Sequence, residues 1–204
     1  MSSGKTGHSL VLYLENLPTL SALEAADTWP QELQADEELI IGFRERASSQ
    51  AVALLEAAHA QLNKGGSVPY RTERRSQRRT VQDQWWMTGR LFRPRERNAR
   101  AYWSLGVDTL RGQGPCLVYM VGPSDPGAGQ FELLTVKAAQ HHGLESANTR
   151  NCFSTESGYD LGVVAGFAKL SPELTHVEAV KALETSISGF LAKFRQEFEA
   201  SLDQ

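Results

Sequence analysis

The sequence contains little cysteine and no long apolar run, and both absences limit what the protein can be. Its only cysteines are Cys116 and Cys152, which are too few for a disulfide framework. Cys116 begins an apolar run, so we expect it to be a buried free thiol. The longest apolar runs, such as LVLYL (10–14), are strand-sized and far shorter than the roughly 20 residues that span a bilayer. We therefore expect a cytoplasmic protein without a membrane partner.

Motifs that would name an activity are also missing. The triplet Gly4-Lys5-Thr6 resembles the end of a phosphate-binding loop, but it lacks the first glycine and the preceding strand. Paired cysteines or histidines at zinc-site spacing do not occur, so we predict no metal and no cofactor. The N-terminus lacks the apolar stretch of a secretory signal. Catalysis stays open, and a non-catalytic protein is favoured.

The length and composition indicate one globular domain. Hydrophobic residues make up 41% of the 204 positions and charged residues 22%, which is ordinary for a soluble domain. A chain of this length can bury a full core without metal or disulfide. We predict a flexible tail over residues 1–8 and a single domain over 9–204. Within that domain, residues 64–80 form a basic segment that could be mobile.

The first third of the chain predicts alternating strands and helices. Apolar and aromatic enrichment favours strands over 9–17 and 38–45. A helix is expected to begin at Ser21, where a capping-box spacing occurs, and a second helix runs from Ser48 or Ser49 to Lys64-Gly65-Gly66. This order is a β-α-β-α segment.

The remainder predicts an antiparallel sheet and a long terminal helix. Short, turn-rich links are typical of antiparallel neighbours, because parallel crossovers need a dozen or more residues. The expected strands cover 80–92, 99–110, 115–122, 130–138 and 161–170. The last helix, 175–202, begins with the capping box Thr175-x-x-Glu178, and Gly189 is expected to bend it. The fold class is α+β, a meander packed against this helix.

Positive charge is concentrated in one quarter of the chain. Residues 64–111 contain 12 basic and four acidic side chains, a net charge of +8. Since the whole chain carries −3, the remainder carries −11. Such asymmetry favours a polyanionic partner, namely DNA, RNA or another polyanion. Eleven of the 12 bases are arginines, whose planar forks grip phosphate and stack on bases.

The spacing of these arginines suggests a binding surface. Residues 71–79, RTERRSQRR, place five arginines at i, i+3, i+4, i+7 and i+8, one face of a helix. A second basic group, RPRERNAR (93–100), joins two expected strands, and the nearby Trp85, Trp86, Tyr102 and Trp103 could stack on bases. The predicted nucleic-acid-binding residues are Arg71, Arg74, Arg75, Arg78, Arg79, Arg90, Arg93, Arg95, Arg97, Arg100, Trp85 and Trp86.

Other interpretations of these residues remain open. The arginine segment could be a solvated loop or could pair with the chain's own acidic segments, and one member of the Trp85-Trp86 pair must face away from the other. The last helix has an apolar stripe at three/four spacing that ends in Phe190, Phe194 and Phe198. Either the stripe covers the sheet, or its aromatic end docks a partner protein or a second copy. The latter would make the protein an adaptor.

Two chemical alternatives complete the predictions. Asp108, Glu132 and Lys137 offer the acidic and basic groups that a magnesium-dependent nuclease requires. His141, His142 and Cys152 could form a metal site or a Cys–His nucleophile pair. The spacing in both sets departs from known motifs, so we predict no catalytic residue.

Overall fold

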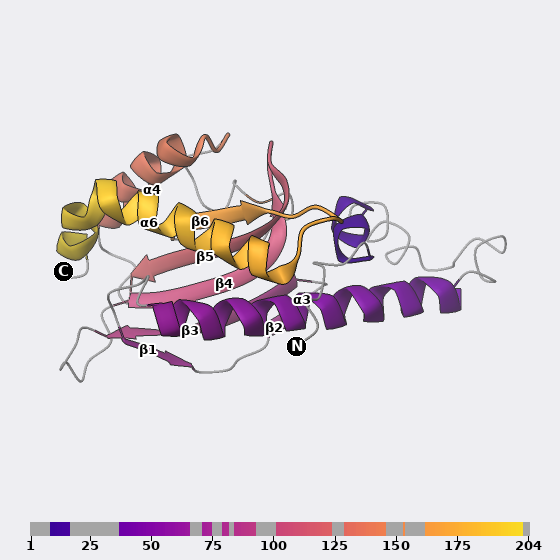
Figure 1. Cartoon of the computed structure of the whole chain (residues 1–204). Coiled ribbons are helices and arrows are strands. Elements are labelled where there is room, and N and C mark those ends of the chain that lie inside the picture. Colours follow the sequence, from indigo (N-terminus) through magenta and orange to yellow (C-terminus); the bar gives the residue numbers. More distant parts are fainter. Residues whose placement is uncertain are drawn as a thin grey trace.

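The computed structural model shows an antiparallel sheet with long helices against it (Figure 1). The described residues are 9–16, 37–65, 71–74, 79–81, 84–92, 101–123, 129–145, 153 and 162–201. The α+β class predicted from the sequence is confirmed, including the long terminal helix packed on the sheet. The expected tail over 1–8, the helix expected at Ser21 and residue Cys152 lie outside the described residues.

Six strands form the sheet, in the order β1-β3-β4-β5-β6, with β2 also paired to β3. All neighbours are antiparallel. Since β4 occupies one edge of β3, β1 and β2 share its other edge. The bounds are β1 Arg71–Arg74, β2 Arg79–Val81, β3 Gln84–Phe92, β4 Ala101–Leu110, β5 Gly114–Pro123 and β6 Val163–Lys169.

The strands predicted over 99–110, 115–122 and 161–170 are confirmed to within a few residues. The strand predicted over 80–92 is confirmed from Gln84 onward, whereas Thr80 and Val81 belong to β2, which pairs antiparallel with β3. Three other predicted strands are wrong. Residues 9–16 are helical, 38–45 belong to helix α3 (Glu37–Gly65), and 130–138 belong to helix α4 (Gly129–His142). The β-α-β-α segment expected before the meander is therefore not formed as predicted. In each case an apolar run that suits a strand also has helical spacing.

The buried residues of these segments explain the helices. In residues 9–16 the buried side chains are Leu10, Val11, Tyr13 and Leu14, a three/four spacing that forms one helical face. In α4, Phe131, Leu134 and Ala138 are buried whereas Leu133 is 59% exposed. A strand would have alternated burial at every second residue instead.

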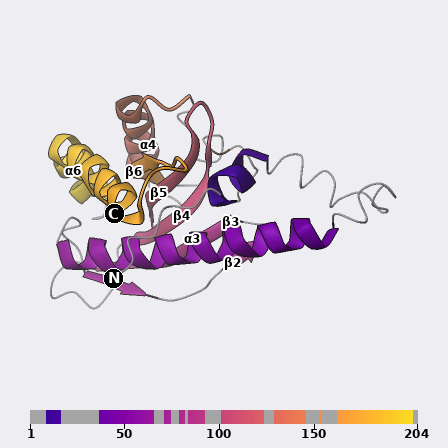
Figure 2. The same cartoon turned by 45° about the vertical axis from the view of Figure 1, so that its right-hand side comes forward.

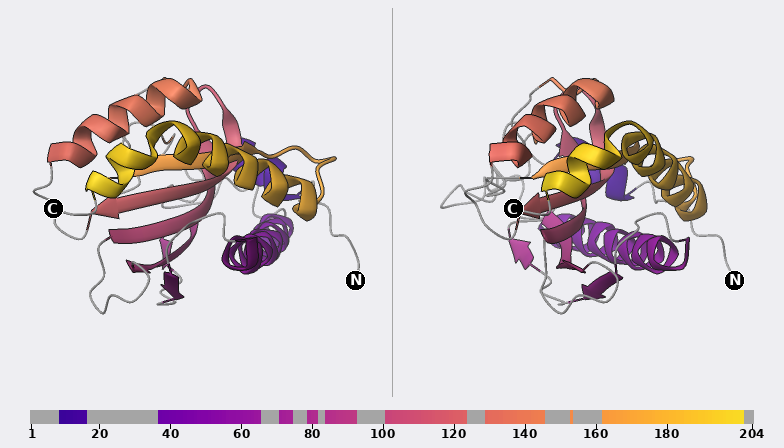
Figure 3. Two further views of the ribbon diagram at one scale, coloured as in Figure 1. Left: turned by 60° about the vertical axis from the view of Figure 1, so that its left-hand side comes forward. Right: turned by 90° about the vertical axis from the view of Figure 1, so that its left-hand side faces the viewer.

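Helices α3 and α6 (His176–Ser201) cover one face of the sheet, which we call the first face. Figures 1 and 2 show the two helices side by side, and Figure 3 shows α4 beside α6 along the same layer. The helix over 9–16 packs on α3, where the backbone N–H of Leu10 donates to Gln50 Oε1 at 2.9 Å. No helix among the described residues is long and apolar enough to cross a membrane.

The first face carries the main core. Trp103 on β4 is 1% exposed, because His59 of α3 stacks on it at 5.2 Å and Tyr119 flanks it. Gly166 on β6 lets α6 approach closely, since a Cβ there would lie 2.8 Å from the backbone nitrogen of Ile187. The core therefore depends on close contact between helix backbone and sheet.

The terminal helix behaves largely as its sequence predicts. Thr175 Oγ1 accepts from the backbone N–H of Glu178 at 3.2 Å, and Glu178 Oε2 accepts from the backbone N–H of Thr175 at 2.9 Å. This confirms the capping box. The bend expected at Gly189 is wrong: the helix departs from helical geometry at Phe194, with φ −121° and ψ 18°.

Candidate functional site

The predicted arginine helix is wrong, because residues 71–74 and 79–81 form strands β1 and β2. Their register places Arg71 opposite Phe92, Arg74 opposite Gly89 and Arg79 opposite Trp86. A helix would have stacked like charges at three/four spacing, whereas pairing with β3 separates them along an edge. Two short basic segments thus pair with the backbone of one strand, β3.

Several predicted arginines lie outside the described residues, but the chain connects them to the same strand. Arg93 directly follows the last residue of β3, and Arg100 directly precedes the first residue of β4. The connection between these strands, 93–100, therefore starts and ends at the β3–β4 pair. The predicted residues outside the described part are Arg75, Arg78, Arg93, Arg95, Arg97 and Arg100.

Trp85 and Trp86 are core residues on opposite faces of the sheet. Each is 3% exposed. Trp85 faces α3 and its indole Nε1–H donates to Ser48 Oγ at 3.0 Å. Trp86 lies on the second face, edge-to-face with Phe153 at 5.5 Å and directly over Gly106. Neither ring is presented as a surface on which a base could stack.

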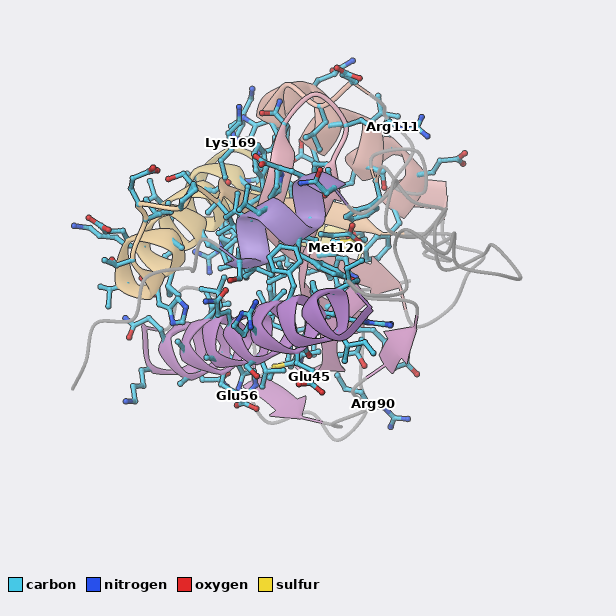
Figure 4. The ribbon with its side chains drawn as sticks, turned by 90° about the vertical axis from the view of Figure 1, so that its right-hand side faces the viewer. Glu45, Glu56, Arg90, Arg111, Met120 and Lys169 are labelled. Carbon is cyan, nitrogen blue, oxygen red and sulfur yellow. The ribbon has the colours of Figure 1, made fainter. Side chains whose placement is uncertain are left out.

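A different aromatic residue occupies an exposed position on the second face. Tyr102 on β4 is 43% exposed, and it is the direct register partner of Arg90 on β3. The Arg90 guanidinium carbon lies 5.9 Å from the centre of the Tyr102 ring, within cation–π range. Figure 4 shows Arg90 pointing away from the body of the molecule, remote from Arg111.

The register partners on the two sides of Tyr102 differ in size. On the other side of Tyr102 the register partner is Gly122 of β5, which has no side chain. In the next row, Thr88 is paired with Ser104, and both are half-buried and polar. We call Thr88, Arg90, Tyr102, Ser104 and Gly122 the polar half of the second face.

The other end of the second face is closed and apolar. Trp86, Leu110, Cys116, Val118 and Phe153 form a buried cluster there, which we call the apolar half. Cys116 is 0% exposed and free, which confirms the predicted thiol. Burial raises the pKa of this thiol to about 12. It is therefore protonated at neutral pH and not poised as a nucleophile.

Asp108 is buried at the margin of the apolar half and is only 1% exposed. Its Oδ1 accepts a hydrogen bond from the backbone N–H of Thr109 at 2.7 Å. Burial raises the pKa of this carboxyl from 3.8 to about 6, against the lowering effects of Thr109 and the Trp86 side chain. A nearly inaccessible carboxylate is poorly placed to bring a metal ion to a phosphate.

The residues of the nuclease alternative do not come together. Glu132 is exposed on α4, and Lys137 forms an ion pair with Glu197 at 3.3 Å. Across the described part of the chain, no group of three or more His, Cys, Asp and Glu side chains could hold a metal ion. The arrangement offers no support for metal-dependent cleavage.

The histidine pair is part of the packing between α4 and α6. His142 stacks on Phe190 at 6.2 Å and meets Phe167 edge-to-face at 5.6 Å, while His141 meets Phe194 at 5.6 Å. Burial lowers the pKa of His142 to about 4, and the charge of His141 adds to this. His142 thus belongs to the packing between α4 and α6, whereas His141 is exposed at its edge.

The same contacts decide between the two interpretations of the terminal helix. Phe190, Phe194 and Phe198 are 0%, 7% and 1% exposed, so the stripe is covered within the chain. Its contacts with β6, β5 and α4 confirm the interpretation that it covers the sheet. The aromatic end is not available to dock a partner.

Comparison with known proteins identifies no relative: no family model matches the chain, and neither the curated proteins nor the solved structures contain a significant match.

The signal for Tyr102 was present in the sequence. Residues 101–105 alternate between Ala101, Trp103 and Leu105, which are buried, and Tyr102 and Ser104, which are not. Such alternation predicts that Tyr102 and Trp103 face opposite sides. The sequence does not say which of the two faces a helix covers, so it does not tell which of the neighbouring aromatic residues is exposed.

Proposed function

We propose that the protein is a non-catalytic nucleic-acid-binding protein, or a subunit of a nucleoprotein complex, that binds single-stranded nucleic acid on the polar half of the second face. The observation that carries the proposal is the exposed Tyr102 ring with Arg90 beside it and a glycine on its other side. Bases stack on exposed aromatic rings of sheet surfaces, and arginine contributes both charge and stacking.

The charge distribution supports phosphate contacts around this ring. The quarter of the chain that contains β1 to β4 carries a net charge of +8, against −11 for the remainder. Strands β1 and β2 follow β3 along its outer edge, and the basic connection 93–100 leaves from its end. A nucleic acid strand that crosses Tyr102 and Arg90 would lie near β3, the strand with which β1 and β2 are paired.

Single-stranded nucleic acid suits the site better than duplex. A duplex keeps its bases stacked inside, so an aromatic ring on a sheet cannot reach a base face. An unpaired base can instead stack against the exposed ring of Tyr102. The proposal keeps a cytoplasmic location, which the free thiol of Cys116 supports.

Fluorescence anisotropy tests the proposal with the full chain. Labelled single-stranded RNA and DNA and a matched duplex are titrated at about 50 and about 200 mM salt. If about six phosphates are neutralised, affinity falls roughly a thousandfold between these conditions. If the protein binds none of the three nucleic acids at the lower salt concentration, the proposal is refuted.

Variants at the site give the sharper test. Tyr102→Ala should weaken single-strand binding by roughly 1–3 kcal/mol while leaving duplex binding unchanged. Arg90→Gln should make the fall of log affinity with log salt concentration less steep, by the amount that corresponds to about one phosphate contact. Arg111→Gln is the matched control, since Arg111 is an exposed arginine at a distant turn. Equal losses in Arg90→Gln and Arg111→Gln would show non-specific attraction without a site.

A further inference from the structure

Helices α3 and α6 leave a half-open groove of about 500 Å³ between them. Its position differs from the proposed nucleic-acid site, because these helices cover the first face and Tyr102 lies on the second. The volume falls within the range of small-molecule sites, about 300–1,000 Å³. The lining residues are Ala57, Ala60, Gln61, Lys64, His176, Val177, Val180, Lys181 and Glu184.

The floor of the groove is apolar and made of small side chains. Ala57 and Ala60 on α3 face Val177 and Val180 on α6 across the groove. The alanines create the hollow, because each extends only one methyl group from its helix. Val177 is 67% exposed, the most exposed large hydrophobic side chain among the described residues. A ligand with an apolar body would remove this surface from water.

The groove contains positively charged groups that are available to bind an anion. Lys64 and Lys181 form no ion pair within the described residues, while Glu184 is already engaged by another group. The Nε2 atom of His176 is buried without a hydrogen-bond partner. Burial lowers the pKa of this imidazole, so the ring is neutral at pH 7 and keeps one donor and one acceptor nitrogen.

The dimensions of the groove select among possible occupants. On α3 its wall runs from Ala57 to Lys64, two helical turns or about 10 Å. A wall of this length and a volume of about 500 Å³ suit a small molecule whose body lies along the alanines and whose head meets the lysines.

We propose that the groove between α3 and α6 binds a small anionic amphiphile, with an aliphatic or aromatic body and a carboxylate or comparable head. The apolar floor takes the body. Lys64 and Lys181 attract the head. This site neither requires nor depends on nucleic-acid binding at Tyr102.

Calorimetric titration of the full chain with decanoate, below its micelle-forming concentration, tests the proposal. Decanol is the neutral comparison ligand. Decanoate should bind at one site and decanol about tenfold more weakly, because the alcohol lacks the charge that the lysines attract. Decanoate should also shift the imidazole resonances of His176. Equal affinity for both ligands, or no binding of decanoate, would overturn the proposal.

Paired variants locate the site. Lys181→Gln should weaken decanoate binding about fivefold to tenfold, while Lys193→Gln on the same helix, outside the groove, should not change it. Ala60→Leu fills the groove and should abolish binding, whereas Ala53→Leu, also at an exposed position of α3, should not. Val177→Glu places an anion at an exposed position and should abolish binding without affecting folding. Binding that survives both Ala60→Leu and Val177→Glu refutes the assignment.

Discussion

Tyr102 and Trp103 are adjacent in β4, yet they have opposite roles because they face opposite sides of the sheet. Trp103 is 1% exposed beneath α3, whereas Tyr102 is 43% exposed beside Arg90. The first face is covered by two long helices along its length. Among the described residues, the second face is covered at its apolar half, around Phe153. An aromatic residue on this sheet is therefore part of the core where a helix covers its face, and is a candidate ligand contact where its face is exposed.

Two aromatic residues on the second face also differ in exposure according to what covers them. Trp86 and Tyr102 both lie on it, but Trp86 is 3% exposed and meets Phe153, while Tyr102 has Gly122 as a neighbour. Aromatic character alone therefore does not identify a stacking surface. Exposure and the size of the neighbouring side chain decide whether a base can reach the ring.

The largest expected effect separates the two neighbours in β4. Trp103→Ala should lower the free energy of unfolding by about 3–5 kcal/mol, because it empties a large volume between sheet and α3. Tyr102→Ala should change it by less than about 1 kcal/mol, since its ring is already half in water. Urea denaturation followed by circular dichroism measures both. A destabilisation by Tyr102→Ala as large as that by Trp103→Ala would show that the ring belongs to the core.

A second test compares the two faces through one glycine on each. A Cβ at Gly166 would meet the backbone of α6 at Ile187, 2.8 Å away, whereas a Cβ at Gly106 would meet the Trp86 indole. Both Gly→Ala variants should destabilise by about 1–3 kcal/mol through overpacking. Gly166→Ala should cost more, because a helix backbone yields less readily than a side chain.

Thermal and urea unfolding of the two glycine variants provide the measurement. Gly114→Ala is not a suitable control, because the φ of +81° at that position strains any other residue. Gly42→Ala on α3 is suitable, since its added methyl would lie 3.6 Å from the Arg46 side chain. Equal stability of the Gly106 and Gly166 variants would indicate that the second face is packed as rigidly as the first.

The smallest expected effect concerns pH, because two buried groups oppose each other. The pKa of His142 falls from 6.5 to about 4 in the fold, so its contribution is complete above pH 6.5 and is lost as pH falls toward 4. The pKa of Asp108 rises from 3.8 to about 6, so stability is instead lost as pH rises from 3.8 to 6. The wild-type protein should therefore show only a weak pH dependence of stability between pH 4 and 6.

Single substitutions should reveal each contribution. In Asp108→Asn, the stability that His142 loses as pH falls is no longer offset by Asp108. The free energy of unfolding should therefore fall by about 1–3 kcal/mol from pH 6.5 to 4. His142→Phe should show the reverse slope, with stability rising as pH falls from 6 to 3.8. Urea unfolding at several pH values measures both slopes. Parallel profiles for the two variants would contradict the assigned pKa directions.

Strands β4 and β5 were predictable because the link between them is short and turn-rich. The capping box at Thr175 and Glu178 followed from local spacing in the same way. The opposite faces of the adjacent tryptophans also followed, since side chains alternate along a strand. In all these cases a local sequence pattern is compatible with a single structure.

The misassigned segments show where such rules fail. LVLYL suits a strand by composition and a helix by spacing, and residues 9–16 become helical because Leu10, Tyr13 and Leu14 then share one face against α3. Residues 71–79 have helical spacing of arginine, but pairing with the free edge of β3 forms strands instead. Neither outcome is visible without the neighbouring element, because local propensity is weaker than tertiary contact.

The sequence by itself determined the α+β class, the meander, the terminal helix and the segregation of positive charge into one quarter of the chain. These depend on periodicity, turn residues and counting, which are local properties. The tertiary structure decided that the arginine segment forms strands along β3, that Trp85 and Trp86 are core, and that Tyr102 is exposed. Burial of a side chain depends on which distant segment covers it, and local spacing contains no record of that packing partner.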